Sequence, residues 1–144
     1  PYPWGRERLG EGTARCNIWS WRFPVENTLR DGHYGTAPVG QYPPNGYGLF
    51  DMAGNVWEVC SDWFDPDHYA RCDAERPTLN PSGPETWSDP MDPLEPKRVM
   101  RGGSFLCNAS YCSSYRVTAR MAHGQSTGMS HVGFRCVWGK QNPE

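Results

Sequence analysis

Residues 45–58 read Asn45-Gly46-Tyr47-Gly48-Leu49-Phe50-Asp51-Met52-Ala53-Gly54-Asn55-Val56-Trp57-Glu58, and this run says more about the architecture than any other part of the chain. It begins with Asn45-Gly46, a turn signal. We expect a short helix over Leu49–Ala53 and then a strand over Val56–Trp63, where apolar and polar residues alternate. Short elements separated by turns are typical of a loop-rich domain.

The composition of the whole chain agrees with this interpretation. The 144 residues suffice for one domain and include 16 Gly and 14 Pro, which excludes a helical bundle or a coiled coil. Disorder is disfavoured because 7 Trp, 7 Tyr and 5 Phe offer large surfaces for burial, while the net charge is only −2. The sequence therefore predicts a compact domain with an aromatic core.

Two classes of partner are excluded by the charge and the hydropathy patterns. The 14 Lys and Arg residues form no basic run, so nothing favours binding of a nucleic acid backbone. No stretch approaches the roughly 20 apolar residues that a membrane-spanning helix needs. We expect neither a nucleic acid partner nor a membrane span.

Downstream of the first strand, the chain alternates between a long loop and short strands. Residues 65–97 hold seven of the 14 prolines and eight of the 16 acidic residues, so we expect a long surface loop there. Short strands are expected over Val99–Leu106, Tyr115–Ala119 and Val132–Val137.

Three blocks of sequence together carry a family resemblance. They are the run 45–58, the run Arg101-Gly102-Gly103-Ser104-Phe105, and Gly133-Phe134-Arg135-Cys136. The chain resembles the C-terminal half of the formylglycine-generating enzyme (sulfatase-modifying factor) family, and shorter matches extend almost to residue 1. The resemblance implies one C-terminal domain part over residues 1–144, expected to pack against its own N-terminal fragment. It also implies an irregular α+β fold of the C-type-lectin-like kind.

The resemblance implies an enzyme that uses dioxygen and Cu(I) to oxidise a cysteine of a substrate polypeptide to Cα-formylglycine. The family's copper-binding cysteines match Cys107 and Cys112. Two thiolates are soft ligands that select Cu(I), and a low coordination number leaves room for the thiolate of the substrate. The alternative is a disulfide between these two cysteines, or two unrelated core thiols.

Further residues match family positions near the reactive pair, and each has a plainer alternative. Ser104 matches a serine beside the pair, although a serine after Gly-Gly is also a common turn residue. Trp57 matches a tryptophan that would exclude water, although a tryptophan in a strand is usually part of the core. Tyr111 and Arg120 match positions near the substrate groove. Their alternatives are a surface role for Tyr111 and a structural ion pair for Arg120.

Two calcium sites are also implied by the resemblance. Their ligands would be side-chain and backbone oxygen atoms, the donors that Ca²⁺ prefers. The first set is Asn17, the Ile18 carbonyl, Asp31 and the His33 carbonyl; the second is Asp51, the Gly54 and Val56 carbonyls and Glu58. The second set matches the family pattern more closely. The alternative role of the two aspartates is in turns or caps.

The sequence departs from the family around the expected groove. Residues 121–126 differ from the usual run after the arginine, and His131 stands where active members often have Asn. His131 is then either a pH-sensitive substrate-binding residue or an ordinary surface histidine. A substrate with a Cys-x-Pro-x-Arg-like segment is implied by the resemblance, but these departures leave the choice of substrate open.

Localisation and the remaining cysteines are less constrained. Cys136 matches a family cysteine whose disulfide partner lies in the N-terminal half, and together with calcium this favours an extracytoplasmic compartment over the bacterial cytoplasm. The motif Asn108-Ala109-Ser110 is a glycosylation acceptor pattern between the two copper ligands, where a glycan would block access. Two other functions stay open: a lectin-like binding or display module without catalysis, and an accessory subunit of a larger complex.

Overall fold

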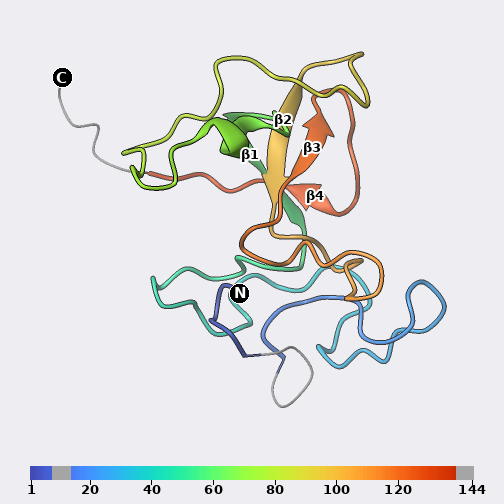
Figure 1. Cartoon of the computed structure of the whole chain (residues 1–144). Coiled ribbons are helices and arrows are strands. Elements are labelled where there is room, and N and C mark those ends of the chain that lie inside the picture. The colour runs from blue at the N-terminus through green and yellow to red at the C-terminus, as the bar shows by residue number, and fades with distance from the viewer. Residues whose placement is uncertain (8–13, 139–144) are drawn as a thin grey trace.

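A small, curled sheet organises the structure. The computed structural model describes residues 1–7 and 14–138, so parts of the domain expected over residues 1–144 lie outside the described residues. The strands are β1 (Trp57–Trp63), β2 (Lys97–Arg101), β3 (Met121–Gly124) and β4 (Val132–Gly133), in the order β3-β2-β1-β4. One 3-10 helix, η1 (His68–Arg71), is the only helical segment among the described residues (Figure 1).

The two central strands carry the buried residues of the sheet. β1 and β2 are antiparallel, with Val59 opposite Met100 and an irregular register between Val59 and Trp63. β3 adds antiparallel to β2, and β4 adds parallel to β1. Val99 is fully buried and Met100 nearly so, because β2 lies between two neighbours. This pairing fixes where the chain leaves β1 and β2 towards the site.

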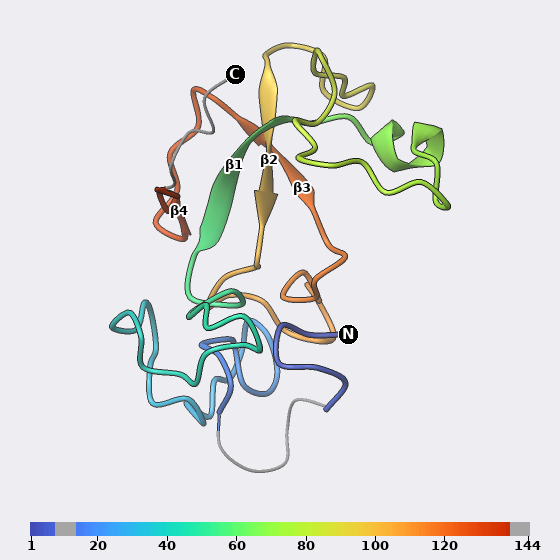
Figure 2. The same ribbon diagram turned by 90° about the vertical axis from the view of Figure 1, so that its left-hand side faces the viewer.

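A second layer, built of irregular chain, lies at one end of the sheet. Figures 1 and 2 show residues 14–56 and the segment between β2 and β3 side by side in this layer. A core cluster joins the layer to the sheet; it contains Cys16, Ala53, Trp57, Met100, Cys107 and Tyr115. The prediction of little regular secondary structure and an aromatic-containing core is confirmed.

Residues 49–53 form no helix, so that prediction was wrong. Asp51 has φ +54° and Asn55 has φ +63°, backbone conformations that interrupt a helix. The Asp51 carboxylate instead accepts the N–H of Gly40, 11 residues earlier, at 2.6 Å, which ties the turn to the preceding loop. Tertiary contacts therefore override the local helical preference here.

The strand predictions were correct for the centre of the sheet and poorer at its edges. β1 begins one residue later than predicted, and β2 runs only to Arg101, because Gly102 and Gly103 have positive φ values and turn the chain away. No strand forms over residues 115–119; the strand is β3, at Met121–Gly124. The predicted strand 132–137 is limited to the two residues of β4.

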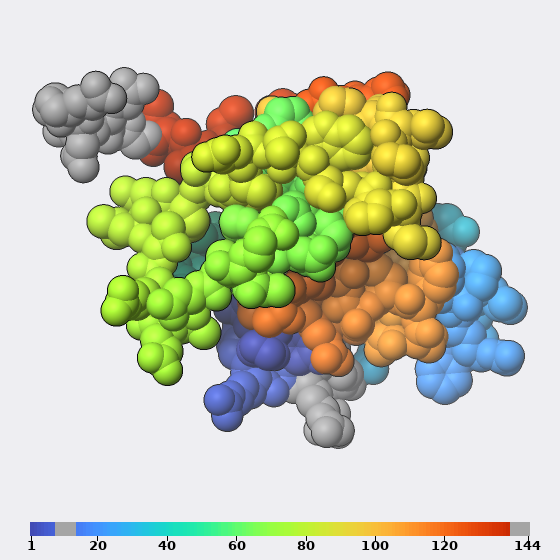
Figure 3. All heavy atoms as spheres, turned by 45° about the horizontal axis from the view of Figure 1, so that its top comes forward, coloured from blue at the N-terminus to red at the C-terminus, as the bar shows by residue number. Residues whose placement is uncertain are grey.

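The segment 65–97 is a long, mostly exposed loop, as predicted, apart from η1 and from Lys97, which begins β2. Figure 3 shows it in green and yellow, spread over the surface turned towards the viewer. The loop is anchored at its end by Lys97, a buried residue whose ammonium pairs with Asp89 at 3.4 Å and also with Asp92. No helix in the described part of the chain is long and apolar enough to cross a membrane.

Candidate active site

Cys107 and Cys112 lie on one tight turn beneath the sheet. The backbone carbonyl of Asn108 accepts the N–H groups of Tyr111 at 3.0 Å and of Cys112 at 2.7 Å, which closes one turn of helix-like chain. This turn brings the two thiols close enough for each to shift the pKa of the other. Cys107 is buried and Cys112 is half-buried, and all six cysteines are free thiols.

The two neighbouring thiols have pKa values shifted in opposite directions. The pKa of Cys112 is lowered to about 6, mainly because the Cys107 thiol donates a hydrogen bond to its thiolate, with further help from Ser114 and from the charge of His131. The pKa of Cys107 is raised by the same hydrogen bond and by burial. The negative charge is therefore favoured on the sulfur of Cys112 rather than on that of Cys107.

Ser104 and Trp57 form the buried side of the pair. The Ser104 N–H points at the Cys107 sulfur at 3.4 Å, and its hydroxyl oxygen accepts the Leu106 N–H at 3.3 Å. Ser104 is 1% exposed, so it has the turn role as well as the proximity to the pair that the sequence suggested. Trp57, 4% exposed, belongs to the same core cluster as Cys107, which agrees with the core role that was its alternative.

The three expected substrate-binding residues lie in different surroundings. Tyr111 is exposed and stacks on Phe23, with ring centroids 4.5 Å apart. His131 lies near enough to Cys112 to influence its pKa, and its ring packs edge-on against Phe105. The structure thus brings Tyr111 and His131 to the cysteine turn.

Arg120, in contrast, binds the long loop. Its guanidinium donates to the Pro66 carbonyl at 3.0 Å and lies 4.4 Å from the ring centre of Tyr69. Its contacts among the described residues are thus a carbonyl and aromatic rings, and not the ion pair that was its structural alternative. The departing residues 121–126 lie in β3 and the turn after it, where Ser126 binds Glu95.

The first set of expected calcium ligands contains a buried amide with an unsatisfied oxygen. Asn17 is 1% exposed, and its Oδ1 has no hydrogen-bond partner, although its Nδ2 donates to the Gly35 carbonyl at 2.7 Å. Asp31 is also buried, and its carboxylate accepts the N–H groups of Ile18 at 2.9 Å and of His33 at 3.1 Å. A buried oxygen without a donor is the environment that a cation satisfies, so this set fits Ca²⁺.

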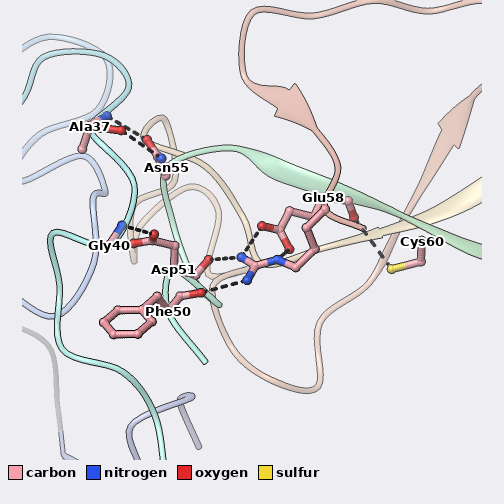
Figure 4. Close-up of polar contacts among 8 residues, drawn as sticks. Ala37, Gly40, Phe50, Asp51, Asn55, Glu58 and Cys60 are labelled. Atoms are coloured by element: carbon pink, nitrogen blue, oxygen red, sulfur yellow. Dashed lines mark hydrogen bonds and ion pairs between the residues drawn. The ribbon is translucent and has the colours of Figure 1, made fainter. Parts of the chain in front are cut away.

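The second set is already engaged by a cation of the protein. Figure 4 shows the Glu58 carboxylate facing the guanidinium of Arg135, which binds both of its oxygens and also donates to the carbonyls of Phe50 at 2.9 Å and Asp51 at 3.1 Å. The Asp51 carboxylate accepts the Gly40 N–H. This set offers fewer free lone pairs than the first, although it matches the family pattern better.

The remaining geometry of the second set is that of a turn held by its neighbours. The N–H of Gly54 donates to the Gly102 carbonyl at 2.8 Å, and Val56 leads directly into β1. Across residues 1–7 and 14–138 there is no cluster of three or more His, Cys, Asp or Glu side chains that would hold a metal ion. A calcium ion at either set would therefore need carbonyl or amide oxygens beside the carboxylates.

Sequence reasoning missed several residues that shape the site. Asn55 ties three segments together. Its Oδ1 accepts the Ala37 N–H at 2.8 Å (Figure 4). Its backbone N–H donates to the Asn17 carbonyl at 2.8 Å. Asn108 is buried, and its amide donates to backbone carbonyls of the Trp19–Trp21 segment, so it is not accessible to a glycan. A buried Asn gives no distinct signal in a single sequence.

These observations define the class of protein: a mostly irregular domain with a small sheet and two neighbouring free thiols on one turn. The sequence model described as "Sulfatase-modifying factor enzyme 1-like domain" matches residues 1–140. The chain belongs to this sulfatase-modifying factor family, which confirms the resemblance seen in its sequence.

Curated relatives agree with the assignment. The chain is 51% identical to the formylglycine-generating enzyme of Streptomyces coelicolor over 94% of its own length and 40% of that protein. It is 44% identical to the enzyme of the same name from Mus musculus over 94% of its own length and 33% of that protein. It thus spans less than half the length of these relatives. Their names connect the family with the generation of formylglycine.

Two further comparisons qualify this similarity. "Inactive C-alpha-formylglycine-generating enzyme 2" from Bos taurus is 31% identical over 99% of this chain and 38% of that protein. The solved structure of PvdO from Pseudomonas aeruginosa aligns with a TM-score of 0.57 at 25% identity, covering 93% of this chain and 42% of that one. The family fold is therefore used by proteins with and without the enzymatic name.

Proposed function

We propose that the chain carries the reactive centre of a copper-dependent oxidase that uses O₂ to convert a cysteine of a substrate protein to Cα-formylglycine. The observation that carries the proposal is the contact between the free thiols of Cys107 and Cys112, one of which is acidic. A protein that only binds partners has no need of this reactive pair. The relatives named as formylglycine-generating enzymes support the same reaction.

The donor set fits Cu(I). Two sulfurs in contact are soft ligands, and the acidic Cys112 supplies one thiolate near neutral pH, while Cys107 must lose its proton when a metal binds. A bound Cu(I) ion supplies the one-electron chemistry that dioxygen activation needs. The overall change consumes O₂ and two equivalents of an external thiol. It releases the substrate sulfur as sulfide and yields an aldehyde, a disulfide and water.

The other residues near the pair have separable tasks. Trp57 closes the buried side and keeps water from Cys107, and the Ser104 N–H donates to the Cys107 sulfur. The ring of Tyr111 is exposed and supported by Phe23, so it offers an apolar platform to a substrate peptide beside Cys112. His131 places a titratable ring on the same side. A proline of a Cys-x-Pro-x-Arg-like segment suits such an aromatic surface.

Arg120 fits a supporting role in this scheme. It holds the loop 65–97 through Pro66 and Tyr69, so its effect on the substrate is indirect. We also infer that the N-terminal fragment expected from the family resemblance completes the substrate groove. Calcium at the Asn17–Asp31 set would stabilise the layer that carries Cys107. It would provide a partner for the unsatisfied Asn17 Oδ1 and a positive charge for the buried Asp31 carboxylate.

The test is a copper-loaded, aerobic reaction of the full protein with cysteine peptides and an external thiol, followed by mass spectrometry. We expect the peptide to lose its thiol and gain an aldehyde. Cys107→Ser and Cys112→Ser should abolish both Cu(I) binding through sulfur and the product. Cys60→Ser is the matched control, because Cys60 is a half-buried free thiol of β1 outside the pair.

A second candidate function is a binding module or accessory subunit without catalysis. The observation in its favour is the similarity to relatives named as inactive, at 31% identity. If copper binds through both cysteines but no peptide of the panel gives an aldehyde, this candidate replaces the oxidase. If copper does not bind through sulfur, the role of the pair as a metal site is refuted as well.

A further inference from the structure

Asn108 stands between the two reactive cysteines and has every polar atom of its side chain engaged. The residue is 9% exposed. Its Nδ2 donates to the carbonyls of Trp19 at 3.0 Å and Trp21 at 2.7 Å, which lie almost 90 residues earlier in the chain. Its Oδ1 accepts the backbone N–H of Ser110 at 2.9 Å and the hydroxyl of the same residue at 2.6 Å.

These contacts act on the geometry of the cysteine pair from both sides. The bond to the Ser110 N–H fixes the start of the turn whose end is the 2.7 Å bond from the Cys112 N–H to the Asn108 carbonyl. The bonds to Trp19 and Trp21 hold the same residue against the neighbouring segment. A further bond joins that segment to the pair directly, since the Trp19 N–H donates to the Cys107 carbonyl at 3.0 Å.

The same segment carries the aromatic platform. The Trp19 and Phe23 rings meet edge to face at 5.2 Å, and Phe23 supports the exposed Tyr111 of the cysteine turn. The carboxamide of Asn108 thus joins the turn that carries the sulfurs to the segment that carries the aromatic support. Loss of its donor group would leave two carbonyls without their partner and release the turn on one side.

We propose that Asn108 is a positioning residue that sets the approach of the Cys107 and Cys112 sulfurs through its bonds to Trp19, Trp21 and Ser110. The proposal rests on the oxidase function proposed above, because one Cu(I) ion bound by both cysteines requires the two sulfurs to lie close together. A carboxamide is required, since the site presents carbonyls to one end of the side chain and donors to the other. Aspartate has the same size but offers only acceptors to the two carbonyls.

The experiment measures the pair without and with metal. In the full protein, the equilibrium of the Cys107–Cys112 dithiol and disulfide with reduced and oxidised glutathione reports the effective concentration of the two thiols. Competition with a Cu(I) chelator reports the affinity for the metal alone. Urea unfolding of each variant reports whether it folds.

We expect Asn108→Asp and Asn108→Ala to lower both the effective thiol concentration and the Cu(I) affinity by about tenfold or more. Ser110→Ala, which removes only the 2.6 Å hydroxyl bond and leaves both bonds to the Trp carbonyls, should lower them by about threefold and folds even if the Asn108 variants do not. The matched control is Asn45→Ala. Asn45 also accepts backbone N–H groups, those of Tyr47 and Leu49, but in an exposed turn outside the pair.

The proposal is overturned if folded Asn108 variants, or Ser110→Ala where those do not fold, keep both quantities unchanged. It is also overturned if Asn45→Ala lowers them as much as Asn108→Ala does. Failure of the proposed function gives a different pattern: the parent protein then does not bind Cu(I), while the glutathione equilibrium still responds to Asn108.

Discussion

Replacing Gly54 by alanine should destabilise the fold far more than the same replacement at Gly48. Both glycines have a left-handed backbone, with φ +72° at Gly54 and φ +76° at Gly48. A Cβ at residue 54 would lie 2.2 Å from the Asn17 backbone oxygen and 2.9 Å from its carbonyl carbon, whereas a Cβ at residue 48 meets nothing within 4 Å. The two variants therefore share the conformational cost and differ only in the overlap.

The magnitude follows from these two contributions. A non-glycine residue in the left-handed region costs about 1–2 kcal/mol, and overpacking against atoms that cannot move adds about 1–3 kcal/mol. The Asn17 carbonyl cannot retreat easily, because it also accepts the Asn55 N–H at 2.8 Å, and the Gly54 N–H is held by the Gly102 carbonyl at 2.8 Å. We expect Gly54→Ala to cost about 2–5 kcal/mol of the free energy of unfolding, and Gly48→Ala about 1–2 kcal/mol.

Urea unfolding followed by tryptophan fluorescence measures the difference. With a slope of about 2 kcal/mol per molar urea, an excess cost of about 2 kcal/mol lowers the midpoint of Gly54→Ala by about 1 M below that of Gly48→Ala. Equal midpoints for the two variants would refute the reasoning, because they would show that the approach of Gly54 to Asn17 is not tight.

Three other outcomes are expected. Arg135→Gln should lower the free energy of unfolding by about 1–2 kcal/mol, since it removes the partner of Glu58 and a donor to two backbone carbonyls, and urea unfolding of the variant checks this. The hydrogen bond from Lys97 lowers the pKa of Asp92, so the ionised carboxylate stabilises the fold above its ordinary pKa, and this contribution is lost as the pH falls through the folded-state pKa. The melting temperature should therefore drop between about pH 5 and pH 3, and a melting temperature that does not change over this range would contradict the prediction. Chelation of calcium should lower the melting temperature of the parent protein but leave that of Asn17→Ala unchanged, and equal responses of the two proteins would count against the Asn17 site.

Local patterns in the sequence predicted the centre of the sheet correctly. The alternation in residues 56–63 and the apolar residues near Val99 are recorded in the chain itself, and β1 and β2 form there. The helix expected over Leu49–Ala53 failed because Asp51 adopts φ +54° and binds Gly40, a contact that no local pattern encodes. Edge strands were misplaced for the same reason: β4 has only two residues, and its place is set by pairing with β1.

The candidate site shows the same division between what is local and what is not. Four residues separate Cys107 from Cys112, so a single turn brings the two thiols near each other, and the family resemblance in the sequence already singled them out as a pair. The partners of Asn108 and Arg135 lie roughly 80 to 90 residues away along the chain. Their roles depend on how the irregular layer folds, and a single sequence holds no direct record of it.

Three consecutive residues connect the proposed calcium site with the cysteine pair. Asn17 contributes the unsatisfied Oδ1, the Ile18 N–H donates to Asp31 at 2.9 Å, and the Trp19 N–H donates to the Cys107 carbonyl at 3.0 Å. A displacement of Asn17 would therefore also displace Trp19, because only one residue separates them and each residue of the segment is bonded to a different part of the layer.

Through this segment, the proposed calcium ion would influence the proposed Cu(I) site. A cation at Asn17 and Asp31 would hold the segment from which Trp19 and Trp21 accept the amide of Asn108. Calcium would then stabilise the geometry of the thiols without touching either sulfur, through ordering of the layer and by mass action on the folded state. The effect of calcium on Cu(I) affinity should accordingly be smaller in Asn108→Ala than in the parent protein, because one of the two links between the sites is lost and only the bond from Trp19 to Cys107 remains.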